Sequence, residues 1–325
     1  MSDTKKWKSR LLSSSIPLEY EVAKVLADLN FTISFDYSYY RNENGLTKEF
    51  STDVKGFLLF PLDNDNEVDA EFNILAECKY REDGKYWVFL PEVNRSDMSI
   101  FSLGRTIKSL TEFSLIKNNE KHIYNFEDKF GYALKGIEIS LSTGDVYDKD
   151  IRHGINQLKY ALPYILKSEI DGNIFGHLED AKPSYTSTVL VTNADLYILN
   201  DNFSINKIKE IDKIEDIASK VPYLVCYSEI GPDFTQHHKE IFKDFGSINQ
   251  YENNLDEFES FQKTLMHKKY KIYNSPTTLC HDFEESSYYI LRKYYSQHFI
   301  CSFQHFPSFM KNLVSTISKV TKIKR

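Results

Sequence analysis

The strongest constraint on the fold is an apolar run that ends in two charged residues, Asn73–Tyr80 (NILAECKY). Because successive side chains of a strand point to opposite faces, Leu75, Glu77 and Lys79 share one face, and the intervening apolar residues share the other. A carboxylate and an ammonium at the end of an apolar strand are costly to bury unless they pair or hold a metal ion. The run therefore predicts a buried strand with a functional site at its end.

Periodicity predicts helices and strands in alternation along most of the chain. Expected helices are 16–29, 150–167, 211–218, 255–267 and 284–299, and expected strands are 31–36, 49–60, 73–80, 187–192, 195–199 and 223–227, the run 195–199 pairing with or neighbouring 187–192. A polar turn is expected at 41–45, and residues 85–135 are interpreted as an insertion of uncertain structure.

These elements predict an α/β fold in which a mixed β-sheet is flanked by helices. We expect this domain to span residues 11–248, with a helical C-terminal region at 249–325. No repeat period is visible in the sequence. The 325 residues and 41% hydrophobic content are sufficient for a large core.

Charge and cysteine usage narrow the class of protein. The net charge of -7 argues against a protein that coats nucleic acid non-specifically, although both ends of the chain are basic. The four cysteines form no CxxC pair, which is typical of reduced thiols in a cytosolic protein. No signal-peptide pattern or membrane-spanning run is apparent, so we expect a cytoplasmic protein with no membrane partner.

Four ordered elements in roughly the first half of the chain resemble the PD-(D/E)xK nuclease superfamily, and most closely its Mrr-like restriction endonucleases. The segment Tyr20–Phe31 resembles the opening helix of that family, with Asn30 in place of the usual glycine. Thr52-Asp53-Val54 is similar to the metal-binding aspartate element but lacks its occasional proline, and Ala76–Tyr80 matches the ExK strand. Gln157–Ala161 is similar to a Gln-x-x-Tyr-Ala element beside the active site. The resemblance implies a restriction-endonuclease-like fold.

The resemblance also implies a metal site and a set of catalytic residues. Asp53, Glu77 and Glu21 would bind Mg²⁺, for which Mn²⁺ would substitute, because this hard cation prefers carboxylate oxygen and water. Lys79 would position the attacking water or offset charge on the transition state. Gln157 would orient a water molecule or a phosphate. Asp53, Glu77, Lys79, Glu21 and Gln157 are therefore the expected catalytic residues.

The implied activity is that of a Mg²⁺-dependent endodeoxyribonuclease acting in restriction or phage defence. Tyr160 is expected to pack beside Gln157 or to stack on a base, and Lys55 is expected to contact the substrate. Gln157 and Tyr160 would alternatively be ordinary interior polar contacts. DNA is the expected partner, together with a second copy of the chain, because a homodimer would cut both strands. A partner protein of a defence system is a further expectation.

The sequence leaves alternatives open. Helical geometry would let Glu19 serve as well as Glu21, and only the resemblance selects Glu21. Glu77 and Lys79 would alternatively form an exposed ion pair of about 0 to 1 kcal/mol. The alternative function is a catalytically inactive nuclease-like module that binds nucleic acid or a partner protein.

Histidines and cysteines offer competing sites. Cys280, His281, His298, Cys301 and His305 include zinc-ligand types, but they lack the paired spacing of zinc motifs and stand among aromatic and aliphatic residues. The adjacent pair His237-His238 is interpreted as a surface feature. The carboxylate site is therefore preferred.

Overall fold

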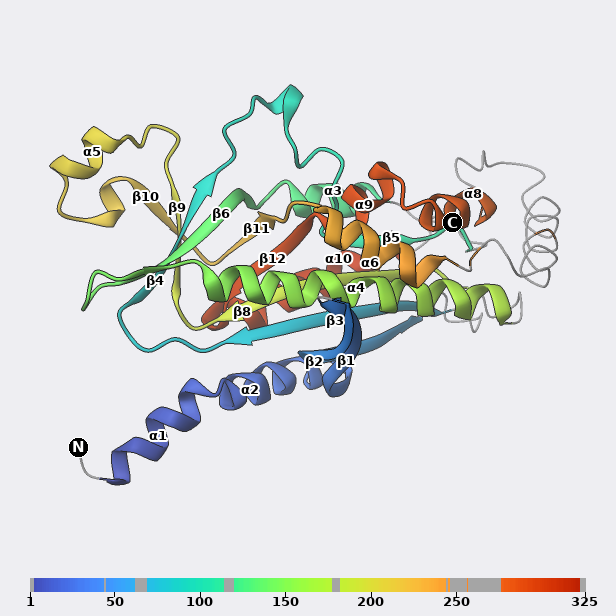
Figure 1. Cartoon of the computed structure of the whole chain (residues 1–325), viewed down its shortest axis with the longest axis horizontal. Helices are drawn as coiled ribbons and strands as arrows, with labels where there is room; N and C mark the ends of the chain where they lie inside the picture. Colours follow the sequence, from blue (N-terminus) through green and yellow to red (C-terminus); the bar gives the residue numbers. More distant parts are fainter. Residues whose placement is uncertain are drawn as a thin grey trace.

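The computed structural model describes residues 3–43, 45–61, 69–113, 120–176, 182–243 and 276–321, together with residues 245 and 256. Its centre is one mixed β-sheet (Figure 1). Across the sheet the strands follow the order β1 (Thr32–Glu43), β2 (Leu46–Pro61), β3 (Asp69–Lys79), β8 (Ser184–Thr192), β12 (Gln297–Ser302), β11 (Tyr223–Tyr227), β6 (Gly131–Ser140), β4 (Lys85–Pro91), β9 (Asp195–Leu199) and β10 (Ala218–Val221). Two short strands lie off this path, β5 (Ile107–Leu110) on β8 and β7 (Val146–Tyr147) on β6.

Helices cover both faces of the sheet and create two hydrophobic cores. One core contains residues of α4 (Lys149–Phe175), α6 (Pro232–Phe242), α8 (Pro276–Glu284) and α9 (Tyr288–Tyr295), and the other contains residues of α2 (Ile16–Ala27), α3 (Lys121–Glu127) and α10 (Phe306–Thr321). The helix α1 (Asp3–Ser13) extends away from the body, and α5 (Ile205–Glu210) lies at the β10 end (Figure 1). Single 3-10 turns occupy Ser96–Met98, Ile214–Asp216 and Phe303–His305. The predicted α/β sheet flanked by helices is confirmed at this level.

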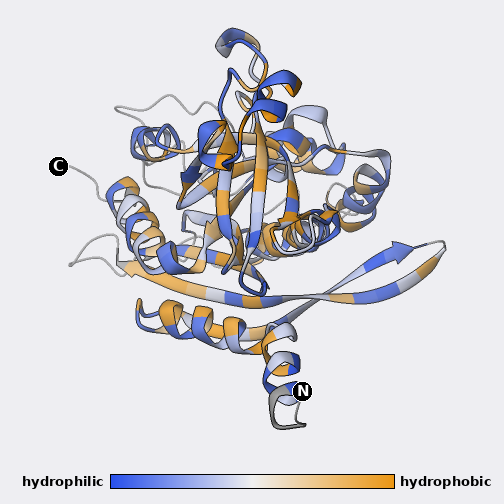
Figure 2. Ribbon diagram, turned by 90° about the vertical axis from the view of Figure 1, so that its left-hand side faces the viewer, coloured by the Kyte–Doolittle hydropathy of each residue, from blue (hydrophilic) through white to orange (hydrophobic). Residues whose placement is uncertain are grey.

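The hairpin of β1 and β2 extends beyond the rest of the sheet as a twisted two-stranded arm (Figure 2). The two strands stay paired as far as Glu43 and Leu46. In contrast, the pairing of β2 with β3 ends at Val54 and Ala76. The last residues of β3, including Glu77, are therefore released from β2, and this opening positions the candidate site.

Several elements follow directly from the sequence pattern. In α2, Pro17 stands in the first turn, where its missing N–H costs no helical hydrogen bond, and Leu18, Val22 and Leu26 are buried. Each residue of β8 is buried, as expected for a parallel strand with both faces covered.

The segment 85–135, interpreted from the sequence as an insertion of uncertain structure, contributes β4, β5 and the start of β6 to the main sheet. β4 and β6 pair with each other, and β6 also pairs with β11. Trp87 and Phe89 of β4 are fully buried. β5 and α3 lie between β4 and β6 in the chain, so no single period runs through the segment.

The C-terminal region is not purely helical, because it contributes the central strand β12. The predicted helix 284–299 is correct only for α9, and Phe299 and Ile300 are fully buried in β12. A short apolar run fits a buried strand as well as a helix. The expected helix 255–267 lies outside the described residues, apart from residue 256.

Three local predictions also need correction. β9 does not neighbour β8, because β3 and β12 already occupy both edges of β8. The predicted helix 211–218 is instead a 3-10 turn leading into β10. The predicted turn at 41–45 is shorter, since β1 continues to Glu43 and the chain reverses near Gly45, whose φ is 80°.

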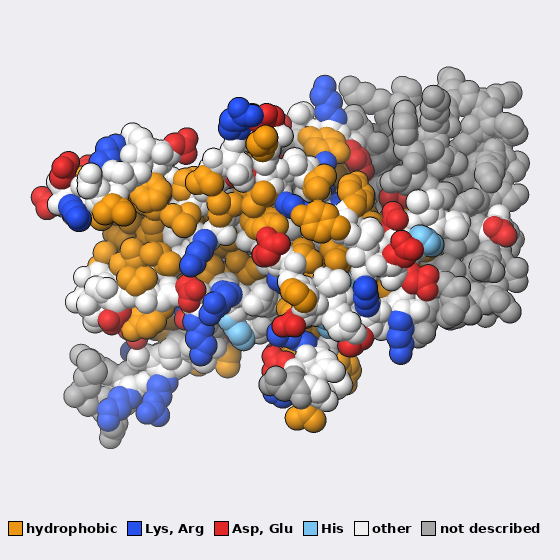
Figure 3. Space-filling view, turned by 45° about the horizontal axis from the view of Figure 1, so that its top comes forward, with side chains coloured by type: hydrophobic (Ala, Val, Ile, Leu, Met, Phe, Trp, Pro, Cys, Tyr) orange, Lys and Arg blue, Asp and Glu red, His pale blue; other side chains and the backbone are white. Residues whose placement is uncertain are grey.

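A third, smaller cluster of hydrophobic residues lies toward the β10 end of the sheet. It contains Val88, Tyr197 and Ala218, with Tyr86 and Ile137 only partly buried against it. In Figure 3, hydrophobic side chains gather on the left part of the face that is in view. The sheet is thus less completely covered at this end.

The histidine pair is interior rather than exposed, so the prediction of a surface feature is wrong. His237 and His238 are 5% and 0% exposed, and Nδ1 of His238 lies 2.7 Å from Oγ of Ser286. Burial lowers the pKa of His238 to about 3.

All four cysteines are free and buried. Among the described helices, none is long and apolar enough to cross a membrane.

Candidate active site

Glu77 and Lys79 form a close ion pair at the end of β3. Nζ of Lys79 lies 2.6 Å from Oε1 of Glu77, whose side chain is fully buried while that of Lys79 is 17% exposed. Within the described part of the chain, Oε2 of Glu77 has no hydrogen-bond partner. The exposed ion pair considered from the sequence is therefore not what the structure contains.

Burial and neighbouring charge determine the protonation of this pair. Burial, followed by the Asp53 carboxylate, raises the pKa of Glu77 to about 8. Burial alone would lower the pKa of Lys79, but the adjacent Glu77 carboxylate offsets it and the pKa is raised. Such a shift on a buried carboxyl group beside a second one marks a candidate functional site.

Asp53 lies where the β2–β3 ladder ends, at the register position across from Glu77. Its Oδ2 accepts a hydrogen bond of 2.6 Å from the backbone N–H of Cys78 and so replaces the missing strand partner. Burial raises the pKa of Asp53, although the Cys78 N–H acts to lower it. The structure therefore brings Asp53, Glu77 and Lys79 together, as the sequence predicted.

The third carboxylate beside Asp53 belongs to Glu19 rather than to Glu21. Burial, then the charges of Asp53 and Asp36, raises the pKa of Glu19 to about 7. Glu21 lies on the exposed face of α2. The two residues are separated by about 200° around the helix at 3.6 residues per turn, so only one can face the site. Of the two glutamates of α2, Glu19 is therefore the one that lies near Asp53, and Glu21 does not join the cluster.

Asp36 of β1 is a further acidic group at this place. It stands across from Asp53 between the paired positions Phe35–Val54 and Tyr37–Thr52. Its φ of 53° is in the left-handed region, which non-glycine residues seldom adopt. Its charge acts on both Glu19 and Asp53.

The N-terminal half of α4 closes the site from the other side. A Cβ atom added to Gly154 would lie 2.6 Å from Cδ1 of Leu190 and 3.4 Å from Cγ of Glu77. The helix can approach β3 and β8 this closely only because the residue is glycine. His153 of α4 is close enough to the site to be affected by its charge, since burial and then the Lys79 charge lower its pKa.

Gln157 supports the strand that carries Asp53. Its Nε2 donates a 3.0 Å hydrogen bond to the carbonyl oxygen of Ser51, while its Oε1 is buried without a hydrogen-bond partner among the described residues. This contact lies two residues from Asp53 on β2. Gln157 is therefore placed as a positioning residue with one free acceptor.

The two expected substrate contacts do not join this cluster. Tyr160 is 6% exposed, with the guanidinium of Arg41 at 4.0 Å from its ring centre and the rings of Phe234 and His237 alongside. Its ring is packed inside the protein and is not placed to stack on a base. Lys55 lines a separate cavity further along β2.

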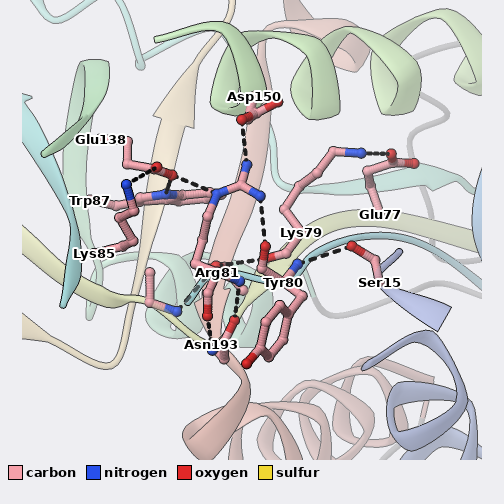
Figure 4. A network of polar contacts seen from close by, with 12 residues as sticks. Ser15, Glu77, Lys79, Tyr80, Arg81, Lys85, Trp87, Glu138, Asp150 and Asn193 are labelled. Carbon is pink, nitrogen blue, oxygen red and sulfur yellow. Dashed lines mark hydrogen bonds and ion pairs between the residues drawn. The ribbon is translucent and has the colours of Figure 1, made fainter. Parts of the chain in front are cut away.

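A polar network holds the chain that follows Lys79 (Figure 4). Nε of Arg81 donates to Oε2 of Glu138 at 2.5 Å, and its Nη2 lies 2.8 Å from Oδ2 of Asp150 on α4. The backbone N–H of Tyr80 donates to Oγ of Ser15 at 3.1 Å. These contacts tie the end of β3 to the chain before α2 and to the start of α4.

The carboxylates fit a cation that needs few protein ligands. Within the described residues no group of three or more His, Cys, Asp or Glu side chains is placed to hold a metal ion. Mg²⁺ is commonly held by one or two carboxylates together with water and substrate oxygen. Asp53 and Glu77 supply that donor set, and the unpartnered Oε2 of Glu77 is a buried oxygen in need of a positive or hydrogen-bonding neighbour. The residues present therefore fit Mg²⁺.

Two of the zinc-ligand types near the end of the chain, His298 and Cys301, form hydrogen bonds within the fold. Nδ1 of His298 lies 2.9 Å from Oγ1 of Thr188, and its Nε2 lies 3.1 Å from the carbonyl oxygen of Tyr295. Sγ of Cys301 donates to the carbonyl oxygen of Ser302.

Sequence reasoning missed three neighbours of the site, of which two had a visible signal. Arg81 continues the alternation of Glu77 and Lys79 along the strand. His153 precedes Gln157 by four residues, which places both on one side of a helix. Asp36 had no signal, because its position depends on the pairing of β1 with β2.

Comparisons with known proteins leave the family of the chain open. No protein-family model matches it, and neither a curated protein nor a solved structure matches it significantly.

Proposed function

We propose that the chain is a Mg²⁺-dependent endonuclease that hydrolyses phosphodiester bonds of DNA, in restriction or phage defence. The observation that carries the proposal is the placement of Asp53 across from the buried Glu77–Lys79 pair, where the β2–β3 ladder ends. The order of these residues in the chain is also that of the PD-(D/E)xK nucleases, which the sequence resembles. A homodimer would provide one site for each strand of a duplex.

In this proposal each group has a distinct task. When bound, the cation supplies a polarised phosphoryl oxygen and a water molecule of lowered pKa. Asp53 and Glu77 would hold it, and the raised pKa of Glu77 means that this carboxyl group must first release its proton. Lys79 keeps its proton on Nζ and faces the attacking water or the developing negative charge. Gln157 fixes β2 and presents its free amide oxygen.

The test is a cleavage assay on supercoiled plasmid and single-stranded DNA, with Mg²⁺, with Mn²⁺ and with a chelator. We expect metal-dependent cleavage that falls at least about 100-fold in Glu77→Gln and in Lys79→Met. The control variant is Glu210→Gln on the exposed helix α5, which should cleave like the wild type. Unchanged cleavage by Glu77→Gln would contradict the proposal. DNA binding without cleavage, with Mg²⁺ as well as with Mn²⁺, would favour the alternative of a catalytically inactive module that binds nucleic acid.

The same assay separates the two glutamates of α2. Because Glu19 faces Asp53 and Glu21 faces solvent, Glu19→Gln should weaken the response to Mg²⁺ and Glu21→Gln should not. A loss confined to Glu21→Gln would restore the assignment made from the resemblance.

A further inference from the structure

A cavity of about 430 Å³ lies between β2, β3 and the C-terminal half of α4, beyond the candidate active site. Lys55 and Phe57 of β2, Asn73 of β3, Glu169 of α4 and Lys182 are among the residues that line it. The volume falls in the range typical of small-molecule sites. The cavity therefore has room for a ligand, and its polar lining suggests which kind.

The floor of this cavity presents one buried acceptor without a donor. Nδ2 of Asn73 donates a 2.8 Å hydrogen bond to Oε1 of Glu169, and Glu169 also accepts bonds of 2.7 Å from Ser184 and Thr186. These bonds fix the amide of Asn73, which is 4% exposed, and leave its Oδ1 without a partner among the described residues. A buried carbonyl oxygen in this state calls for a ligand that donates a hydrogen bond.

The wall of the cavity presents a positive charge and an aromatic ring. Nζ of Lys55 lies 4.9 Å from the ring centre of Tyr37, and within the described ranges no carboxylate is at ion-pair distance from it. Lys182 differs, since its Nζ lies 3.1 Å from Oε1 of Glu71. The half-buried ring of Phe57 lines the same space. The charges of Glu169 and Glu71 act on Lys55, but among the described residues neither is paired with its Nζ, so Lys55 is the lining cation that can contact an anionic ligand.

We propose that this cavity binds one nucleotide unit, with its phosphate on Lys55, its base against Phe57 and a base N–H donating to Oδ1 of Asn73. The choice of a nucleotide rests on the proposed nuclease function. Lys55 follows Asp53 by two residues on the same strand, which separates them by about 7 Å at 3.3 Å per residue. A nucleotide in the cavity therefore neighbours the place where the phosphodiester would be cut.

The test measures binding separately from cleavage, by isothermal titration calorimetry on the full chain and on Glu77→Gln. The probes are AMP, whose exocyclic amine is a donor, and three fragments of it, adenosine, ribose 5-phosphate and inorganic phosphate. We expect AMP to bind both proteins at least 10-fold more tightly than each fragment. Lys55→Met should weaken AMP binding at least 10-fold, Lys55→Arg should restore most of it, and Lys48→Met on the arm is the control that should change nothing.

Each outcome decides a separate question. Absence of AMP binding, equal binding of AMP and ribose 5-phosphate, or an unaffected Lys55→Met variant would overturn the nucleotide site. Cleavage that persists without AMP binding overturns the cavity proposal alone and leaves the nuclease proposal in place. AMP binding by a protein that never cleaves DNA supports the cavity and overturns the nuclease.

Discussion

Glu77 has two oxygens in different environments, one on Lys79 at 2.6 Å and one buried without a hydrogen-bond partner in the described part of the protein. Its neighbour Asp53 adds a second negative charge, and burial raises the pKa of both groups. A proton and a metal ion compete for a carboxylate in this position, because binding of either one neutralises the buried negative charge. Two predictions follow from this competition at the level of single side chains.

The first prediction concerns the pH dependence of stability in metal-free buffer. Folded Glu77 retains its proton up to a pKa of about 8, whereas the unfolded chain releases it near 4.5. Between these values the folded form binds more protons, so the free energy of unfolding falls as pH rises, by up to about 1.4 kcal/mol per pH unit for this group. Urea titrations across this window should show a shallower fall in Glu77→Gln than in the wild type. Parallel curves would contradict the raised pKa.

The second prediction separates structure from chemistry at Asp53. Asp53→Ala leaves the Cys78 N–H without its acceptor and should lower the free energy of unfolding by about 1–3 kcal/mol. Asp53→Asn keeps an acceptor oxygen and should remain near wild-type stability, yet lose the Mg²⁺ response. Thermal unfolding with and without Mg²⁺ measures both effects. Equal destabilisation by Asp53→Ala and Asp53→Asn would show that the hydrogen bond from the Cys78 N–H does not account for the loss of stability.

At the scale of elements, α4 connects the two sites, because its first half covers Glu77 and its second half lines the cavity at Glu169. Its two glycines have opposite surroundings. A Cβ on Gly154 would collide with Leu190, whereas a Cβ on Gly172 would meet nothing within 4 Å. Close contact between the helix backbone and the sheet therefore requires a glycine at position 154 but not at position 172.

This difference predicts opposite effects for the same substitution. Gly154→Ala should lower the free energy of unfolding by about 1–3 kcal/mol, because its Cβ would lie 2.6 Å from Cδ1 of Leu190 and overpack this contact. Gly172→Ala should raise stability by about 0.4–1 kcal/mol, since alanine restricts the unfolded chain. Urea unfolding of the two variants side by side measures both, and a stabilising Gly154→Ala would show that α4 shifts without strain.

The sequence predicts elements well where a single pattern is complete. The stripe of α2 was found close to its observed bounds, whereas β3 begins four residues earlier and α4 ends eight residues later than predicted. The placement of Asp53 beside Glu77 was also foreseen, since neighbouring strands carry both residues. Periodicity failed where a short strand depends on distant partners, as in β4, β6 and β12, and it could not distinguish Glu19 from Glu21. Those choices depend on how the elements pack, which local patterns do not encode.

At the scale of the whole molecule, the sheet is continuous only because residues near the C-terminus enter its centre. β12 pairs with β8 on one side and with β11 on the other. The strands that carry Asp53 and Glu77 lie on the β8 side, and β11, β6 and β4 lie on the other. The C-terminal region is therefore part of the fold that holds the site, rather than a separate appendage.

This continuity predicts that a chain truncated after Asn249 does not fold cooperatively. The truncation removes β12 and α10, and with them fully buried side chains such as Phe299 and Ile300, each of which contributes about 1.5–3 kcal/mol by burial. It also exposes the edges of β8 and β11, whose unpaired backbone groups would favour aggregation. Circular dichroism during urea titration should show no cooperative transition, whereas a control chain truncated after Thr321 keeps every described element and should unfold like the full chain. A cooperative transition in the shorter chain, with a midpoint near that of the full protein, would mean that residues 11–248 fold as an independent domain and that β12 is dispensable.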